Sequence, residues 1–279
     1  MTQPLGRGPA ARRAFQALVR AERPLLFLDL DGTLAPLREN PDRARVPATT
    51  RRTIVALRRT GAEVVLVSGR SARAVARISG TPVDAILGDH GARLLEGGRL
   101  QPWLPADRAR LQRAARAVEQ FLAGRHGIWL ERKDRSLAIH LRLPGGHAHR
   151  TVGEVAALLR RLGLRVLHGN RVLDAQLPGV NKGAAVRRWL RRGKKAAVLY
   201  AGDDTTDQDA FRALTPGAVT IAIGRRVSGA AFATRNPATL AAWLRRLAQA
   251  RAGSVRAALV AARGPARTAG RAPPGRAAR

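Results

Sequence analysis

The sequence predicts an α/β fold, a doubly wound, Rossmann-like parallel sheet into which a smaller α+β domain is inserted. Short apolar runs without helical periodicity, such as residues 25–28 and 63–67, predict strands that are buried on both faces. Amphipathic stretches alternate with these runs, which is the pattern of a parallel sheet covered by helices. With 279 residues, 45% of them hydrophobic, the chain is long enough to bury a sizeable core.

The elements of the first part follow this alternation. Residues 1–9 are expected to be disordered, and Phe15, Leu18 and Val19 share one face of a short helix over 10–22. The core elements expected next are strands at 25–28, 63–67 and 83–87, helices at 49–60 and 71–78, and a hairpin over 93–100.

The order of elements changes between residues 106 and 174. A helix followed by two strands occurs twice there, and Gly169 with Asn170 has the character of a hairpin turn. The expected elements are helices at 107–122 and 149–162 and strands at 128–132, 137–142, 165–167 and 171–177. This order is antiparallel in style, so we interpret the segment as a small inserted α+β domain.

The core then resumes with helices at 181–192, 206–214 and 237–249 and strands at 196–201 and 219–223. The sequence therefore predicts four regions. They are an N-terminal extension at 1–23, a core domain at 24–105 and 175–250, the inserted domain at 106–174, and a mobile tail rich in Arg and Ala at 251–279.

The net charge of +32 raises the question of nucleic-acid binding. Only four of the 51 basic residues are lysine, and the arginines are spread over the whole chain beside Ala and Gly. This distribution indicates a compositional bias rather than a built phosphate-binding patch. We therefore expect no specific nucleic-acid partner.

Cysteine is absent, which excludes disulfides, thiolate metal sites and cysteine nucleophiles and fits a reducing cytoplasm. The runs 196–201 and 257–262, with six residues each, are among the longest apolar runs of the chain. A membrane helix needs roughly 18 apolar residues. The basic N-terminus lacks a continuous apolar stretch, so no secretory signal is expected. We expect a cytoplasmic protein with no membrane partner.

Two aspartates, Asp29 and Asp31, follow the first core strand. Because side chains in a strand have a period of two, both carboxylates can project into the same space at the carboxyl edge of the sheet, where open α/β sheets bind ligands. Gly32 permits a sharp turn there, and Thr33 can bond the turn backbone. Carboxylates this close need a proton or a metal ion to offset their charge; the alternative is that they cap the next helix.

Two further loops follow core strands. Ser68 and Gly69 precede Arg70 and a helix N-terminus, which is either an anion site or an ordinary strand-to-helix turn. His90 lies between glycines, where it either contacts a ligand or satisfies loop carbonyls.

A lysine and an acidic loop complete the set of candidate groups. Lys182 stands at the start of a helix, where the alternative is a solvated side chain. The acidic loop that follows the strand at 196–201 is either functional or a capped turn, and it contains Asp203, Asp204, Asp207 and Asp209.

Together these groups suit phosphoryl transfer. We interpret Asp29 as the nucleophile and Asp31 as the general acid and base, with Ser68 and Lys182 holding the phosphoryl oxygens. Hard carboxylates without a His or Cys cluster indicate Mg²⁺. We expect Asp203, Asp29 and the backbone carbonyl of Asp31 to be its protein ligands, while Asp204 and Asp207 orient bound waters, the lysine or the metal shell.

The motifs DLDGT, VSGR, a lysine that begins a helix, and GDDTTD occur in this order over residues 25–223. This series resembles the four motifs of the haloacid dehalogenase superfamily of phosphohydrolases, and the inserted segment is similar to their cap. More narrowly, FLDLDGTLAPL, GDHGARL, LERKDRSLAIHLR, GVNKG and GDDTTD resemble the trehalose-6-phosphate phosphatase family. The resemblance implies a Mg²⁺-dependent phosphatase that forms trehalose from trehalose 6-phosphate through an aspartyl-phosphate.

The resemblance also implies roles for residues that contact the substrate. The family's GxHG loop matches residues 88–91, and its cap motif matches Glu131, Lys133, Ser136 and His140. The implied roles are phosphate contact by Lys133 and sugar-hydroxyl contact by Glu131. The full set implied to bind substrate is Gly32, Thr33, Gly69, Arg70, His90, Glu131, Lys133, Ser136 and Asp174.

Several positions depart from the family pattern, which bears on the fit of the disaccharide. Asp174 replaces a longer glutamate, and Gln176 replaces a basic residue. The other departures are at Asp134, Leu141 and Gln208. Two alternatives stay open: a phosphatase for sucrose, glucosylglycerol or hexose phosphates, and a non-catalytic sugar-phosphate or polyanion binder. We expect a monomer, and the resemblance implies functional coupling to a trehalose-phosphate synthase.

Overall fold

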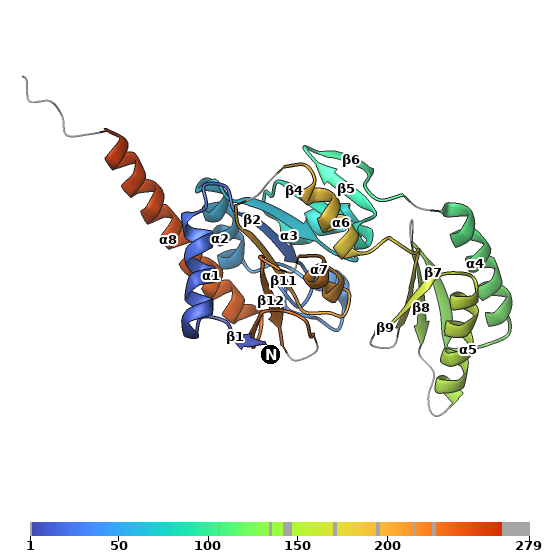
Figure 1. Cartoon of the computed structure of the whole chain (residues 1–279). Coiled ribbons are helices and arrows are strands. Elements are labelled where there is room, and N and C mark those ends of the chain that lie inside the picture. The colour runs from blue at the N-terminus through green and yellow to red at the C-terminus, as the bar shows by residue number, and fades with distance from the viewer. Residues whose placement is uncertain are drawn as a thin grey trace, which may run out of the picture.

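The computed structural model describes residues 2–105, 107–133, 136–141, 147–169, 172–193, 196–214, 216–224 and 227–263. It confirms the predicted fold class, because a large, mainly parallel sheet with helices on both faces carries a smaller antiparallel sheet with helices of its own (Figure 1). We call the part built on the large sheet the core. The part that runs from α4 (Arg108–Leu122) to β10 (Val172–Gln176) is called the cap.

The core sheet has the strand order β1-β13-β12-β11-β2-β3-β4-β5-β6, in which β4, β5 and β6 pair antiparallel and the other neighbours pair parallel. Its strands are β1 (Gln3–Pro4), β2 (Leu25–Asp29), β3 (Glu63–Val67), β4 (Ala85–Gly88), β5 (Arg93–Glu96), β6 (Arg99–Pro102), β11 (Val198–Gly202), β12 (Val219–Ile223) and β13 (Phe232–Thr234). Its helices are α1 (Gly8–Arg20), α2 (Ala48–Arg59), α3 (Ala72–Ser79), α6 (Lys182–Leu190), α7 (Asp207–Leu214) and α8 (Pro237–Arg263). Two short 3₁₀ turns are η1 (Pro41–Arg43) and η2 (Asp89–Gly91).

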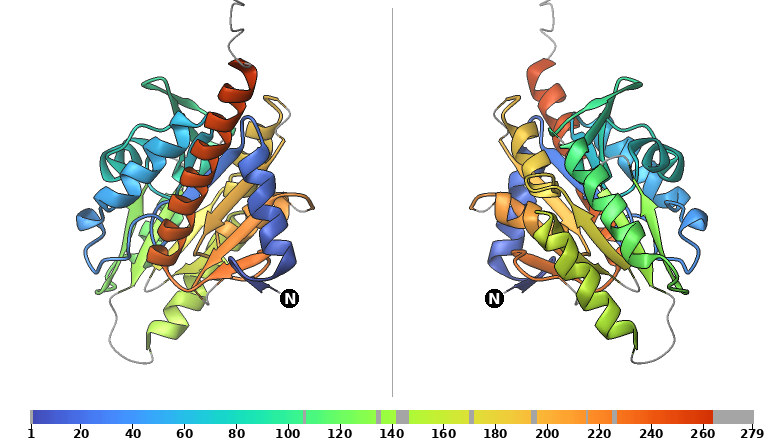
Figure 2. Two further views of the ribbon diagram at one scale, coloured as in Figure 1. Left: turned by 90° about the vertical axis from the view of Figure 1, so that its left-hand side faces the viewer. Right: turned by 90° about the vertical axis from the view of Figure 1, so that its right-hand side faces the viewer.

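Side chains of β2 alternate between two hydrophobic layers, one on each face of the core sheet. Leu26 and Leu28 pack with residues of α1, α2, α3 and α8, whereas Leu25 and Phe27 pack with residues of α6 and α7. Figure 2 shows α1 and α8 side by side on one face of the sheet. A strand covered on both faces needs an unbroken apolar run, which is why the sequence of β2 shows no alternation. No helix within the described ranges is long and apolar enough to cross a membrane.

The cap sheet has the strand order β7-β8-β10-β9, and its strands pair antiparallel. Its remaining elements are β7 (Ile128–Arg132), β8 (Ser136–Leu141), α5 (His147–Arg161) and β9 (Arg165–Gly169). The helices α4 and α5 lie on the side of this sheet away from the core, so its other face points toward the core (Figure 1). This element order agrees with the prediction from the sequence.

Two expectations about the ends of the chain were wrong. Residues 1–9 were expected to be disordered, but Gln3 N donates to Ala231 O at 2.9 Å and Leu5 N donates to Ala233 O at 2.8 Å, which adds β1 to the core sheet. This pairing uses backbone groups, so no side-chain pattern indicates it. The last helix was expected to end near 249 but continues to Arg263, and residues 264–279 lie outside the described residues. We propose a core of 2–105 and 177–263 and a cap of 107–176.

Arg251 lies in the segment that was expected to be a mobile tail, yet only 2% of it is exposed. Its guanidinium donates to the carbonyl oxygens of Leu18, Val19 and Ala21 at 2.6–3.1 Å and to that of Thr60 at 2.7 Å. Carbonyls at the C-terminal end of a helix have no partner within the helix. One arginine of α8 therefore satisfies carbonyls at the ends of α1 and α2 and ties the three helices together.

Replacing Arg251 with methionine removes these hydrogen bonds but keeps an extended side chain. We expect the free energy of unfolding to fall by about 2–4 kcal/mol, because several buried carbonyls lose their donor. Urea denaturation followed by circular dichroism measures this change. Arg256→Met, at an exposed position of the same helix, is the matched control and should change stability by less than about 0.5 kcal/mol. Equal effects of both substitutions would contradict the role of Arg251.

Candidate functional site

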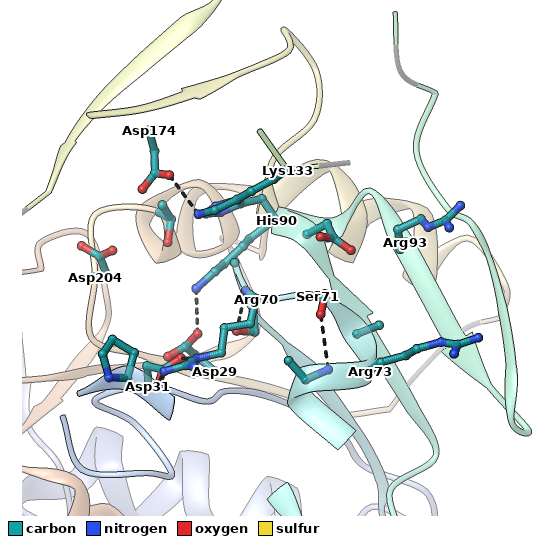
Figure 3. Close-up of a pocket in the computed structure, with 18 of the residues that line it drawn as sticks. Asp29, Asp31, Arg70, Ser71, Arg73, His90, Arg93, Lys133, Asp174 and Asp204 are labelled. Carbon is teal, nitrogen blue, oxygen red and sulfur yellow. Dashed lines mark hydrogen bonds and ion pairs between the residues drawn. The ribbon is translucent and has the colours of Figure 1, made fainter. Parts of the chain in front are cut away.

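The carboxyl ends of the central core strands and the open face of the cap sheet enclose a pocket of about 720 Å³ (Figure 3). The pocket brings together most of the residues that the sequence predicted for the site. These are Asp29, Asp31, Ser68, Gly69, Arg70, His90, Lys182, Asp203 and Asp204 from the core and Glu131, Lys133, His140 and Asp174 from the cap. Four other predicted residues do not line it in this structure, namely Gly32, Thr33, Ser136 and Asp207.

Lys182 lies at the centre of the core side of the site and is 3% exposed. Its Nζ atom donates at 2.8 Å to Asp29 Oδ1 and at 2.8 Å to Asp207 Oδ1. Asn181 positions this lysine, because its side chain accepts a hydrogen bond from Ala184 N at 2.8 Å and so starts α6 at Lys182. Burial lowers the pKa of Lys182, but the two carboxylates outweigh burial, so the net shift is upward and the amine stays charged.

Asp207 is fully buried and accepts hydrogen bonds from three directions. Besides Lys182, the hydroxyl of Tyr200 donates to its Oδ1 at 2.6 Å, and Asp204 N donates to its Oδ2 at 3.0 Å. The ring of Tyr200 packs between Phe27 and Phe211, with centroid distances of 6.3 and 5.7 Å. These contacts hold Asp207 as a fixed anion behind the lysine.

Burial raises the pKa values of two carboxyl groups in the site. Burial raises the pKa of Asp29 well above 3.8; Lys182 lowers it, and Asp207 and Asp203 raise it further. Burial raises the pKa of Asp203 to about 7, and the next largest cause is Asp207. The cluster therefore holds more negative charge than a single lysine neutralises.

A divalent cation fits this cluster. One carboxylate oxygen each from Asp29, Asp203 and Asp207 lies within 4.8 Å of the others. The carboxylate of Asp203 accepts no hydrogen bond from any described residue, and Gly32 makes room for it, because a Cβ atom at Gly32 would overlap that carboxylate. Oxygen ligands of this kind suit Mg²⁺. Gly32, predicted to bind substrate, is placed to accommodate Asp203.

Asp31 and Arg70 form a two-pronged ion pair at the edge of the pocket. Arg70 Nε donates to Asp31 Oδ2 at 2.6 Å, and Nη2 donates to Oδ1 at 2.7 Å. The hydrogen bonds that Arg70 donates to Asp31 raise the pKa of Arg70. Ser68 Oγ accepts a hydrogen bond from Arg70 N at 3.2 Å, so these two residues and Asp31 form one connected group.

His90 is buried, and its backbone has a positive φ of 55°. Its ring packs against Gly69, where a Cβ atom would lie 2.6 Å from His90 Cε1. Burial lowers the pKa of His90 to about 3, with Lys182 as the next cause, so the imidazole is neutral. Its Nδ1 atom and the hydroxyl of buried Thr33 have no hydrogen-bond partner among the described residues.

The cap contributes two polar pairs to the pocket. Lys133 Nζ lies 3.5 Å from Asp174 Oδ1, and His140 Nε2 lies 2.7 Å from Glu131 Oε2. Figure 3 shows Lys133 and Asp174 on the opposite side of the pocket from Asp29 and Asp31. Residues predicted from the cap motif thus face the predicted catalytic residues across the pocket.

The positions that depart from the family pattern have different environments. Gln176 is buried, and neither polar atom of its side chain has a partner among the described residues. Leu141 is half-buried in β8, and Gln208 Nε2 lies 3.5 Å from Ser228 Oγ. Ser136, which matches the cap motif, is buried. The departure at residue 134 lies outside the described residues.

Among the residues of the site that sequence reasoning missed, three are of particular interest: Arg73, Arg93 and Tyr200. Arg73 and Arg93 line the pocket, but in a chain with so many arginines no pattern distinguished them. Tyr200 was also missed. It is the only tyrosine of the chain and stands three positions before Asp203, so its position could have served as a signal. Its role depends on a contact with Asp207 that is made by folding.

Comparisons with known proteins agree on one family. The family described as Trehalose-phosphatase matches residues 27–237. A trehalose-phosphate phosphatase from Mycobacterium marinum is 33% identical over 262 residues, covering 84% of this chain and 65% of the relative. A trehalose-6-phosphate phosphatase-related protein from Thermoplasma acidophilum is 29% identical over 211 residues, covering 75% of this chain and 90% of the relative. The chain thus spans less than two thirds of the length of its mycobacterial relative.

A solved structure has the same fold. The C-terminal domain of trehalose-6-phosphate phosphatase from Candida albicans superposes with a TM-score of 0.75. The alignment covers 89% of this chain and 98% of the other, at 21% sequence identity. The match includes both the core and the cap architecture, since it extends over most of each chain.

The Tyr200→Phe substitution tests whether the tyrosine hydroxyl stabilises the buried carboxylate of Asp207. The substitution keeps the ring between its aromatic neighbours but removes the hydroxyl that donates to Asp207. We expect the free energy of unfolding to fall by about 1–3 kcal/mol, because a buried carboxylate loses one donor. Chemical denaturation measures the effect, and unchanged stability would show that the hydroxyl does not support Asp207.

Proposed function

We propose that this chain, which belongs to the trehalose-phosphatase family, hydrolyses trehalose 6-phosphate to trehalose and inorganic phosphate. The observation that carries the proposal is the buried group formed by Lys182, Asp29 and Asp207, which faces the polar cap residues across one pocket. A nucleophilic carboxylate beside a fixed cation is what transfer of a phosphoryl group requires.

In the first step, one oxygen of Asp29 attacks phosphorus and the bond from phosphorus to the sugar oxygen breaks. Asp31, in its protonated form, gives a proton to the leaving sugar oxygen. Lys182 and Ser68 hold the phosphoryl oxygens, and the charge of the lysine is assured by its two carboxylate partners. This step leaves trehalose and a phosphoryl group bound to Asp29.

In the second step, Asp31 takes a proton from a water molecule, which attacks the phosphorus of the aspartyl-phosphate. Phosphate leaves, and the carboxylate of Asp29 is restored. Both roles of Asp31 require it to leave its ion pair with Arg70. The phosphoryl dianion of the incoming substrate is a competing partner for that guanidinium, so substrate binding favours the release of Asp31.

Asp29, Asp203 and the backbone carbonyl of Asp31 are the residues that would hold Mg²⁺. A bound Mg²⁺ ion neutralises negative charge on the phosphoryl oxygens. The pair of carboxyl groups with raised pKa values supports this assignment, because a cation at that position offsets the charge that burial disfavours.

The cap sets the preference for the sugar. Glu131, His140 and Asp174 offer acceptors and donors for sugar hydroxyls, and Lys133 offers a positive charge to the phosphate. Another sugar phosphate is the alternative substrate, since Asp174 is shorter than the family's glutamate. We also propose a cytoplasmic monomer that is coupled in function to a trehalose-phosphate synthase, in keeping with the lack of cysteine and the sugar-phosphate chemistry.

Phosphate release from trehalose 6-phosphate, sucrose 6-phosphate and glucose 6-phosphate tests substrate and cofactor together. We expect selective release from trehalose 6-phosphate in the presence of Mg²⁺, and loss of at least about 100-fold in rate when a chelator removes the ion. A preference for a hexose phosphate would overturn the trehalose assignment. No phosphate release from any of the three would favour a non-catalytic binder.

Asp29→Asn tests the nucleophile. The amide keeps the shape of the side chain but cannot form the phosphoryl ester, so we expect turnover to fall by at least about 1,000-fold on every substrate. Circular dichroism checks that the fold is retained. Glu39→Gln, at an exposed acid two residues before Pro41 of the pocket lining, is the matched control and should leave the rate unchanged. Activity of Asp29→Asn near the wild-type level would remove the aspartyl-phosphate from the mechanism.

A further inference from the structure

Trp129 is a large apolar side chain that stays 43% exposed. It lies on β7 two residues before Glu131, so both side chains are on the same face of the cap sheet. Its partner in the sheet register is His140 on β8. The helices α4 and α5 cover the opposite face, so Trp129 belongs to the face that points toward the core.

The indole of Trp129 stacks on the imidazole of His140, with ring centroids 4.8 Å apart and an interplanar angle of 9°. His140 in turn is bonded to Glu131, through only one of the two carboxylate oxygens. Both His140 and Glu131 line the pocket, whereas Trp129 stands beside them just outside its lining. The three side chains therefore extend the pocket wall by a flat aromatic surface with polar groups along one edge.

This combination suits a sugar ring. A hexose has a face of C–H groups that can cover an aromatic ring, and hydroxyls at its rim that need hydrogen-bond partners. Ligand sites typically combine aromatic surface with a few placed polar groups, and indole supplies a large rigid contact area. Here Trp129 supplies the apolar area, while Glu131 and His140 supply an acceptor and a ring nitrogen.

The position of Trp129 along β7 indicates which of the two sugar rings of a disaccharide phosphate it would contact. Lys133 continues the β7 pairing, since its N donates to Ser136 O at 3.0 Å, and its charge affects the pKa of His90 in the core. Trp129 is four residues farther along, about 13 Å away at the rise of an antiparallel strand. With the phosphate held at Lys133, as proposed above, the ring attached to it would lie near that lysine, and a second ring would extend toward Trp129.

We propose that Trp129 is the stacking surface for the sugar ring that does not carry the phosphate, beside the hydroxyl contacts already proposed for Glu131 and His140. This inference rests on the proposed function, and it makes Trp129 a residue that determines specificity for disaccharide phosphates over hexose phosphates. The phosphoryl chemistry is independent of it, because Trp129 lies outside the group around Lys182.

The kinetic test compares Trp129→Ala, Trp129→Phe and the control Leu37→Ala, which removes another exposed apolar side chain, on the core. For Trp129→Ala we expect kcat/KM for trehalose 6-phosphate to fall about 10- to 100-fold, mainly through KM, because losing an aromatic contact of this kind costs a factor of that size. Hydrolysis of glucose 6-phosphate and of p-nitrophenyl phosphate should change less than about twofold. Trp129→Phe should recover most of the loss, and Leu37→Ala should behave as wild type.

A binding test needs no turnover. Of the four tryptophans, Trp103, Trp189 and Trp243 are buried, so the fluorescence change caused by a sugar at this surface comes from Trp129. Trehalose alone should change the emission of the wild-type protein, and Trp129→Phe should abolish that response. If the wild type prefers a hexose phosphate, the proposed function fails and this inference with it. If the wild type prefers trehalose 6-phosphate and Trp129→Ala keeps that preference, the inference alone is overturned.

Discussion

The double ion pair of Lys182 with Asp29 and Asp207 is the constraint on which the rest of the site depends. All three groups are buried, and a buried charge is tolerated only when it is paired and hydrogen-bonded. Tyr200 and the backbone of Asp204 complete the pairing of Asp207, so the lysine is held from one side and directed toward Asp29. Four separate elements, β2, α6, β11 and α7, must meet correctly for this arrangement to exist.

The core and the cap divide the work of the pocket. The core supplies fixed charges at the ends of parallel strands, where a reacting phosphoryl group needs preorganised partners. The cap supplies a sheet with one covered and one open face, and the open face carries side chains suited to a sugar. An ion pair between Arg165 of β9 and Asp209 of α7 joins the two parts beside the pocket. In the proposed function, the core sheet thus carries the phosphoryl chemistry and the cap sheet carries the recognition of the sugar.

The many arginines of the chain contribute through individual contacts. Arg251 donates to carbonyls at the ends of two helices. Arg70 forms an ion pair with Asp31, and Arg58 forms one with Asp84. These partners lie in different parts of the core. Such scattered contacts are expected when the high arginine content is a compositional bias and individual arginines form local interactions. Arg73 and Arg93 add positive charge to the pocket, which favours the approach of an anionic substrate.

The sequence by itself determined the fold class, the inserted cap and the identity of the polar groups at the strand ends. Those features depend on local patterns: the apolar run before Asp29, the capping residue before Lys182, and the hydrophobic period of each helix. Only the tertiary structure decided the partners. Lys182 lies 153 residues from Asp29 along the chain, and neither Tyr200 nor Trp129 carries a local sign of the residue it contacts. The edge strand β1 could likewise not be predicted from the sequence, because it forms through backbone hydrogen bonds between distant segments, which need no side-chain pattern.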